Sequence, residues 1–246
     1  MQINKFKKVG KSKYKIIFDH TDLTLYEDVI LKYDLLIKKD VDIDLIDKII
    51  EENKVYEAYH SALSYIEIKM RNRKEIYNYL NKKGFDDNLI NKTIDKLDNL
   101  NLLNNDSYIS AYINDKVNLT NDGPYKIKNN LIDLDFDEDS IDKYLNKIDD
   151  SVWQEKLKKL INKKSSIMKS KSYFMFINKL KNDLYNLGYS KDMIEESLSN
   201  IEYVSNAIDK DFNRARNKYK DDKNKIINYL LRKGYSYNDI LNCFEN

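Results

Sequence analysis

The sequence contains one proline and only five glycines in 246 residues. β-Sandwiches and barrels depend on many tight turns, which glycine and proline usually form. Their scarcity argues against an all-β fold and favours helices. A single cysteine, Cys243, excludes an internal disulfide and any zinc site that needs several cysteines.

Long apolar runs are also missing. No stretch approaches the roughly 18 consecutive apolar residues that a membrane-spanning helix requires. The residues from Met1 to Lys5 lack the apolar core of a signal peptide. We therefore expect a cytoplasmic protein that makes no membrane contact.

Neither sign of charge dominates the composition. The chain has 43 Lys and Arg residues against 41 Asp and Glu residues, so its net charge is +2. This balance does not predict strong attraction of the whole molecule to nucleic acid, although local basic patches could still bind it. Aromatic residues make up 12% of the chain, so bulky side chains are available for a core, which argues against wholesale disorder.

The first fifty residues differ from the rest. Residues 13–18 and 23–26 are short β-prone runs separated by a polar turn, which predicts a hairpin, and residues 3–9 could add a third strand. Apolar residues between Val29 and Ile37 suggest a short helix, and a second helix is expected to begin near Asp42 or Asp44. We predict a small β-containing cap over residues 1–54.

A repeat begins near residue 55. Four segments align on Leu80, Leu131, Leu184 and Leu230, which lie about fifty residues apart. Each of these leucines has Ile or Leu four residues earlier, Phe or Tyr five residues later and Ile ten residues later. The pair four residues apart is one turn of a buried helical stripe.

The residues that follow each leucine predict how its helix ends. Gly84, Gly188 and Gly234 stand where a left-handed residue would terminate a helix, and Asp135 takes this place in the second copy. The next aromatic residue would fill the corner. The residue after it is Asp or Ser, which are good N-caps for a following helix.

A further helix upstream of these two completes each three-helix unit. In the first unit we expect it over Tyr56–Met70, and in the second we expect Asn105 or Asp106 to cap it. Asn72 and Glu75 form a capping-box pattern, and Pro124 suits the first helical turn. The sequence thus predicts a mainly α, elongated array of tandem three-helix repeats with boundaries at residues 55–103, 104–149, 150–203 and 204–246.

Several of these strings resemble the RecX family of regulatory proteins. Residues 58–65, 71–76 and 80–85 resemble its first repeat. Residues 102–112 are similar to its junction into the second repeat, and residues 122–127 are similar to its glycine-proline entry into the next helix. The β-prone residues 14–18 also fit, so the clear similarity covers roughly residues 13–145.

The resemblance implies a non-enzymatic modulator of the RecA recombinase. Members of this family lie along the groove of the RecA filament on single-stranded DNA and commonly limit its growth, ATP hydrolysis, strand exchange and coprotease activity. We therefore expect a monomer that binds this filament and needs no cofactor.

Three basic patches are candidate partner-binding sites. The candidates are Arg71, Arg73, Lys74, Lys82 and Lys83 in the first patch, Lys158, Lys159, Lys163, Lys164, Lys169 and Lys171 in the second, and Arg214 and Arg216 in the third. They could meet carboxylates of the filament or DNA phosphates. The alternative is that they are ordinary solvated helix faces.

No motif indicates catalysis. His20 and His60 lack a paired nucleophile or metal-ligand spacing, and no glycine-rich phosphate-binding loop occurs. Most tyrosines fall on or beside predicted core stripes, so packing explains them better than base stacking does. The alternative function that stays open is direct nucleic-acid binding by a helical repeat protein, with possible weak DNA contact of its own.

Overall fold

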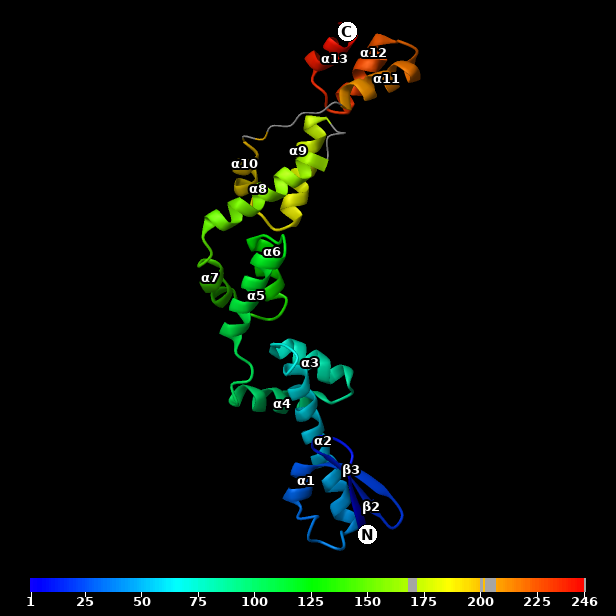
Figure 1. Cartoon of the computed structure of the whole chain (residues 1–246), viewed down its shortest axis with the longest axis vertical. Helices are drawn as coiled ribbons and strands as arrows, with labels where there is room; N and C mark the ends of the chain where they lie inside the picture. The colour runs from blue at the N-terminus through cyan, green and yellow to red at the C-terminus, as the bar shows by residue number, and fades with distance from the viewer. Residues whose placement is uncertain (168–171, 200, 202–206, 246) are drawn as a thin grey trace. The chain divides into compact units, whose positions relative to one another are not determined.

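The computed structural model describes residues 1–167, 172–199, 201 and 207–245 and is drawn in Figure 1. The described residues form three strands and thirteen helices. The strands are β1 (Ile3–Lys8), β2 (Lys13–Phe18) and β3 (Asp22–Tyr26). The helices are α1 (Glu27–Lys32), α2 (Ile43–Ile66), α3 (Arg73–Lys82), α4 (Asp87–Asn99), α5 (Asn105–Leu119), α6 (Pro124–Ile132), α7 (Glu138–Leu145), α8 (Asp150–Ile167), α9 (Tyr173–Asn186), α10 (Lys191–Leu198), α11 (Ala207–Tyr219), α12 (Lys223–Arg232) and α13 (Tyr237–Glu245).

The expected mainly α class with a small N-terminal sheet is confirmed. The chain divides into two compact units, Met1–Tyr108 and Ile109–Asn246, and the division falls inside α5. None of the helices in the described ranges is both long and apolar enough to cross a bilayer.

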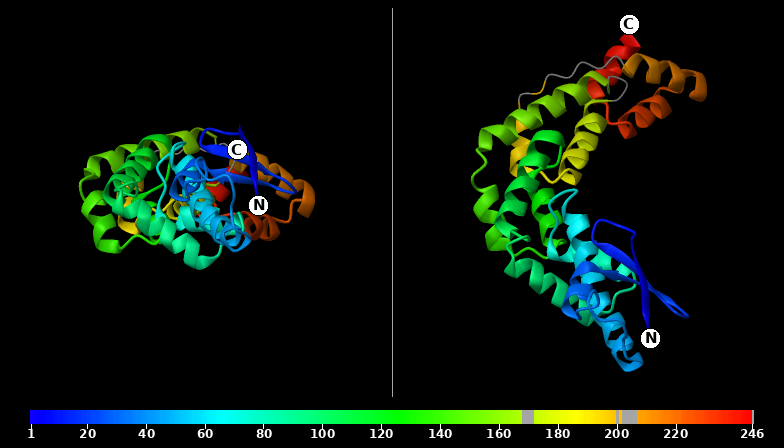
Figure 2. Two further views of the ribbon diagram at one scale, coloured as in Figure 1. Left: turned by 90° about the horizontal axis from the view of Figure 1, so that it is seen from below. Right: turned by 60° about the horizontal axis from the view of Figure 1, so that its bottom comes forward.

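The N-terminal sheet is antiparallel with strand order β1-β2-β3. Helices α1 and α2 pack beside β3, as the views of Figures 1 and 2 show. The buried residues Ile16, Leu25 and Val29 belong to this core. Of the apolar run near residue 36, only Leu35 is buried, whereas Leu36 and Ile37 are exposed.

Helix α2 is longer than expected. It runs without interruption from Ile43 to Ile66 and crosses the predicted boundary between residues 54 and 55. Ile46 and Ile49 lie in the core beneath the sheet, while Ala62 lies in the core shared with α3 and α4. The expected separate helix over Tyr56–Met70 is therefore wrong in its start and its end. The physical reason for the earlier start is that residues 50–58 contain no glycine or proline that would end a helix, and the Asn53 side chain bonds the backbone of Tyr26 and Thr24.

From α2 onward the helices follow one another in four triplets, α2–α4, α5–α7, α8–α10 and α11–α13. The four aligned leucines, Leu80, Leu131, Leu184 and Leu230, lie on the middle helices α3, α6, α9 and α12, and all are fully buried. The isoleucines ten residues later are buried as well.

The corner after each middle helix has the predicted left-handed conformation. The backbone angle φ is +88° at Gly84, +66° at Asp135, +87° at Gly188 and +79° at Gly234. In each corner the N–H of the following aromatic residue donates to the carbonyl of the aligned leucine, as in Phe85 to Leu80 and Tyr189 to Leu184, both 3.3 Å.

The caps after the corners are confirmed too. Asp86, Asp137, Ser190 and Ser236 each accept a hydrogen bond from the backbone N–H three residues later. Asn72 and Glu75 form the expected capping box, and Pro124 occupies the first turn of α6. The cap of α5 is one residue earlier than expected, because Asn104 Oδ1 accepts from the Ser107 N–H at 2.8 Å.

Within the second unit, the middle helices meet end to end. The Gly123 N–H donates to the Leu187 carbonyl at 2.6 Å, and the Tyr125 N–H donates to the Gly188 carbonyl at 3.1 Å. The last carbonyls of α9 thus satisfy the first amides of α6, where Gly123 has no side chain to act as a cap. A Cβ on Gly123 would lie 2.6 Å from the Gly188 oxygen, so the close approach requires glycine.

The next junction repeats this arrangement. The Ser172 hydroxyl, which caps α9, also donates to the carbonyl of Lys233 at the end of α12. Gly234 lies against the ring of Phe174. In both junctions, the start of one middle helix therefore contacts the corner of the next triplet.

Candidate binding surfaces

The first basic patch separates into an internal and an external part. Arg71 belongs to the internal part, because its side chain is only 11% exposed. Its guanidinium lies 3.7 Å from the centre of the Tyr65 ring and pairs with Glu75 at 3.1 Å. Tyr65 in turn stacks on Tyr79, with ring centres 4.0 Å apart. Arg71 therefore holds the first triplet together and does not present its charge to a partner.

Glu75 is the centre of this internal network. Burial by itself would raise the pKa of its carboxyl. The Asn72 N–H, the Tyr108 hydroxyl and the Arg71 guanidinium donate to the carboxylate and outweigh burial, so the pKa lies below its ordinary value. The charged form of Glu75 is thus part of the folded structure.

The external part lies on and after α3. Arg73 forms ion pairs with Asp95, at 3.2 Å, and with Asp98, both on α4. Lys74 is partly exposed, and Lys82 and Lys83 are exposed at the end of α3. Lys82 and Lys83 are therefore the residues of the first patch best placed to meet another molecule.

Lys83 lines a groove in the first unit of about 420 Å³. Lys11 of the β1–β2 connection and Lys13 at the start of β2 line this groove, together with His60 and Tyr79. The pKa of Lys13 is raised, first by its hydrogen bond to Tyr26 and also by Glu57, so it is charged at neutral pH. Sequence reasoning missed Lys11 and Lys13, because only the packing of the sheet against α2 brings them near α3.

The second basic patch follows α8. Lys158 and Lys163 are exposed, and neither forms an ion pair within the part of the chain that the structure describes. Lys159 pairs with Glu155 and Lys164 pairs with Asp183, both at 2.6 Å. The remaining two candidates of this patch, Lys169 and Lys171, lie outside the described residues.

The third patch is the weakest candidate for binding a partner. Arg214 lies 3.7 Å from Asp211, and Arg216 donates from its Nε to Asp221 at 2.7 Å. Both side chains are at least half exposed. Their charges are thus partly neutralised by neighbouring carboxylates of α11 and the turn that follows it.

A buried carboxylate joins α5 to the start of α6. Asp122 accepts from Lys126 at 2.8 Å and from Lys116 at 3.3 Å. Burial would raise its pKa, but these two lysines lower it below the ordinary value of 3.8. Lys156, from the basic stretch of α8, donates to the Val117 carbonyl at 2.6 Å, and burial lowers its pKa. Lys156 is therefore a packing residue.

Tyr189 lies in the same region and fills the corner after α9. Its side chain is buried, and its hydroxyl makes no hydrogen bond within the described residues. Burial, with a smaller contribution from the charge of Asp122, raises the pKa of Tyr189 to about 12. This tyrosine acts as a core aromatic, as its position in the repeat predicts.

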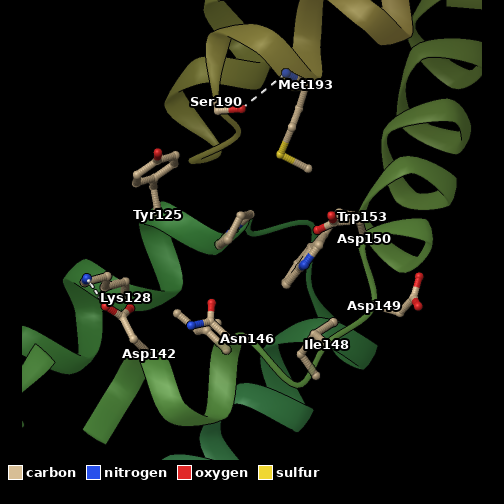
Figure 3. Close-up of a pocket in the computed structure, with 12 residues that line it drawn as sticks. Tyr125, Lys128, Asp142, Asn146, Ile148, Asp149, Asp150, Trp153, Ser190 and Met193 are labelled. Atoms are coloured by element: carbon tan, nitrogen blue, oxygen red, sulfur yellow. Dashed lines mark hydrogen bonds and ion pairs between the residues drawn. The ribbon is translucent and has the colours of Figure 1, made fainter. Parts of the chain in front are cut away.

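A cavity lies in the second unit, where α6 and α7 face α8 and α10 (Figure 3). It measures about 710 Å³. Trp153 and Met193 supply apolar surface, while Asp149 and Asp150 supply charge. Tyr125 lines this cavity and also a second cavity of about 530 Å³.

In residues 1–167, 172–199, 201 and 207–245, no three His, Cys, Asp or Glu side chains lie where they could hold a metal ion together. His60 stacks on Tyr26 with ring centres 4.4 Å apart and lies 3.3 Å from Asp28 Oδ2. These two contacts hold the imidazole in place.

Comparison with known proteins gives a consistent result. A family model described as the first three-helix domain of RecX matches residues 58–97. The regulatory protein RecX of Clostridium perfringens (strain 13) is 34% identical over 184 residues, which cover 72% of this chain and 86% of that protein. The regulatory protein RecX of Streptococcus agalactiae (strain NEM316) is 29% identical over 256 residues, covering 98% and 97% of the two chains.

Two solved structures are similar as well. A crystal structure of regulatory protein RecX has a TM-score of 0.66 at 22% identity and covers 81% of this chain and 99% of that chain. The crystal structure of RecX from Lactobacillus salivarius has a TM-score of 0.53 at 29% identity, with coverage of 59% and 94%. The first likeness concerns the fold alone, and it supports the helical triplets described above.

Proposed function

The chain belongs to the RecX family of regulatory proteins, and from this premise we propose that it binds the RecA filament on single-stranded DNA and limits its activities. The mechanism is non-covalent: successive helical triplets dock along the filament and hinder its growth, ATP hydrolysis and coprotease action. No cofactor or catalytic step is involved.

The observation that carries this proposal is the fourfold recurrence of one structural module. Each triplet has the same buried leucine, the same left-handed corner and the same cap on the next helix. A filament presents identical subunits at regular intervals. Several similar modules on one chain can therefore each make a weak contact, and together they bind strongly through effective concentration.

The exposed lysines are the best candidates for the charged part of the interface. Lys82 and Lys83 are exposed, and Lys83 shares a groove with Lys11 and Lys13. Arg71 is removed from the candidates by its burial against Tyr65. We therefore place the first contact of the chain with the filament at the groove of the first unit.

The test adds the purified chain to RecA assembled on single-stranded DNA and measures ATP hydrolysis and filament length. We expect inhibition at amounts well below one chain per RecA subunit, because one chain engages several subunits. Lys82→Glu/Lys83→Glu should weaken this inhibition about tenfold, since charge repulsion replaces attraction at the interface. The matched control is Lys7→Glu/Lys8→Glu on β1, whose side chains are exposed and do not line the groove. An unchanged RecA activity at any ratio would contradict the proposal.

Direct nucleic-acid binding is the second candidate. Lys158 and Lys163 on α8 favour it, because both are exposed and neither has an ion pair among the residues that the structure describes. It predicts tight binding of a labelled single-stranded oligonucleotide without RecA, with an affinity that falls steeply with salt. Tight binding of this kind together with no effect on RecA would establish the second function in place of the first.

A further inference from the structure

Tyr125 is exposed although its backbone is firmly held. Its ring is 58% exposed, while its N–H donates to the Gly188 carbonyl. The neighbouring Gly123 is fixed by a 2.6 Å hydrogen bond to Leu187. The side chain is thus presented to solvent from a rigid support. Binding through such a residue loses little conformational entropy, because its backbone is ordered beforehand.

The surroundings of Tyr125 are concave on two sides. It lines the cavity of about 710 Å³ shown in Figure 3 and the neighbouring cavity of about 530 Å³. Tyr185, which is 68% exposed, lines the second cavity as well. An aromatic side chain between two hollows can be enclosed by a partner on both faces, which is the usual setting of an interface hot spot.

The charges around the larger cavity indicate the class of partner. Lys128 is neutralised by Asp142 at 2.8 Å and Glu138 at 3.0 Å. Asp149 and Asp150 have no ion pair within the described ranges. The Ser151 hydrogen bonds lower the pKa of Asp149, which keeps it ionised. This rim repels phosphates and attracts lysine or arginine.

An equivalent aromatic residue stands at the next junction. Phe174 is the second residue of α9, as Tyr125 is of α6, and it is 61% exposed. The Phe174 side chain lies against Gly234, the corner of the following triplet, whereas Tyr125 contacts Gly188 through its backbone N–H. An exposed aromatic residue in the first turn of the middle helix thus occurs in two consecutive triplets, which suits a partner built from identical subunits.

We infer that Tyr125, with Phe174 as its counterpart, is an anchor for a protein partner that presents an apolar side chain next to a lysine or arginine. The apolar side chain packs against the tyrosine ring, and the cation meets Asp149 and Asp150. This inference rests on the proposed function, in which the partner is the protein component of the RecA filament and not its DNA.

The experiment measures inhibition of RecA ATP hydrolysis by full-length variants. Tyr125→Ala should raise the concentration required for half inhibition about tenfold, because hot-spot truncations commonly have effects of this size. Tyr125→Phe keeps the ring and should behave as the natural chain does. Asp149→Lys/Asp150→Lys should also weaken inhibition. Leu119→Ala, which removes an apolar side chain of the same unit that is even more exposed, should not.

The outcomes separate the two proposals. If the natural chain inhibits RecA and both Tyr125→Ala and the aspartate variant inhibit equally well with unchanged thermal stability, the anchor is wrong while the proposed function stands. If the natural chain has no effect on RecA, both are wrong. If Asp149→Lys/Asp150→Lys instead inhibits more strongly and also binds a labelled single-stranded oligonucleotide more tightly, the surface faces nucleic acid and the inference is overturned.

Discussion

At the scale of single residues, Asp122 shows how a buried charge can join two helices of one triplet. It is buried, it precedes α6, and it is bonded by Lys116 of α5 and Lys126 of α6. A buried carboxylate with two cationic donors is stabilised only while it is ionised. The packing of α5 against the start of α6 is therefore sensitive to acid.

The lowered pKa of Asp122 sets the sign of this effect. The folded state binds this proton more weakly than the unfolded chain, so the stabilisation is complete above the ordinary pKa of 3.8. It is lost as the pH falls through the lower folded value. Asp122→Asn should lower the free energy of unfolding at pH 7 by about 1–3 kcal/mol, and its stability should depend less on pH below 4. Urea unfolding between pH 7 and pH 3 measures both, and equal slopes for the two proteins would contradict the assignment.

Substitution of Tyr189 is expected to raise the free energy of unfolding, whereas substitution of Asp122 is expected to lower it. Its buried hydroxyl lacks a hydrogen bond within the described residues, whereas the Tyr235 hydroxyl, at the equivalent place in the fourth triplet, donates to Asp211 at 2.9 Å. Tyr189→Phe removes an unsatisfied group and should raise the free energy of unfolding by up to about 1 kcal/mol. Tyr235→Phe should lower it by about 1–2 kcal/mol. Urea denaturation of both variants measures the contrast, and a loss of stability in Tyr189→Phe would show that the hydroxyl has a partner.

At the scale of elements, the corners are identical in backbone and different in surroundings. Gly84 and Gly188 have nearly the same positive φ. A Cβ on Gly84 would meet nothing within 4 Å, whereas a Cβ on Gly188 would lie 2.4 Å from the Lys126 nitrogen. The first glycine is needed only for conformation, and the second is needed also for contact between α9 and α6.

This pair of glycines permits a direct comparison. Gly84→Ala should lower the free energy of unfolding by about 1–2 kcal/mol, because a residue with a Cβ is strained in the left-handed conformation. Gly188→Ala should cost about 1–3 kcal/mol more, because overpacking displaces the start of α6. Thermal or urea unfolding measures the difference. Equal losses for the two variants would mean that the end-to-end contact of the middle helices contributes no stability.

At the scale of the whole molecule, the near balance of charge constrains how the chain binds. The net charge is +2, and many of the basic candidates are paired with acids of the same unit. In the proposed binding to a filament, repeated apolar and polar contacts then supply most of the affinity, with a smaller part from exposed lysines.

This balance predicts weak salt dependence. Between 50 and 200 mM salt, we expect the concentration for half inhibition of RecA to change less than about tenfold, whereas a protein with 6–10 phosphate contacts loses about 10³–10⁵ in affinity. Titrations at both salt concentrations, corrected for RecA activity without the chain, test this. A loss of a thousandfold would favour DNA binding.

The corners and caps could be predicted because they depend on short-range interactions. A left-handed glycine, the aromatic residue after it and an Asp or Ser cap interact with residues three to five positions away. Such signals lie within a few residues of one another and can therefore be recognised in a short stretch of sequence. The same locality explains the correct strands of the N-terminal sheet.

The sequence by itself therefore determined the class of fold, the recurrence of the module and the family. Only the tertiary structure decided which charges and aromatic residues are available to a partner. Arg71 is hidden by a cation–π contact with Tyr65, and Tyr125 is presented because its backbone joins Gly188, more than sixty residues away. Exposure depends on contacts between segments distant in the chain, and no local pattern of residue types encodes them.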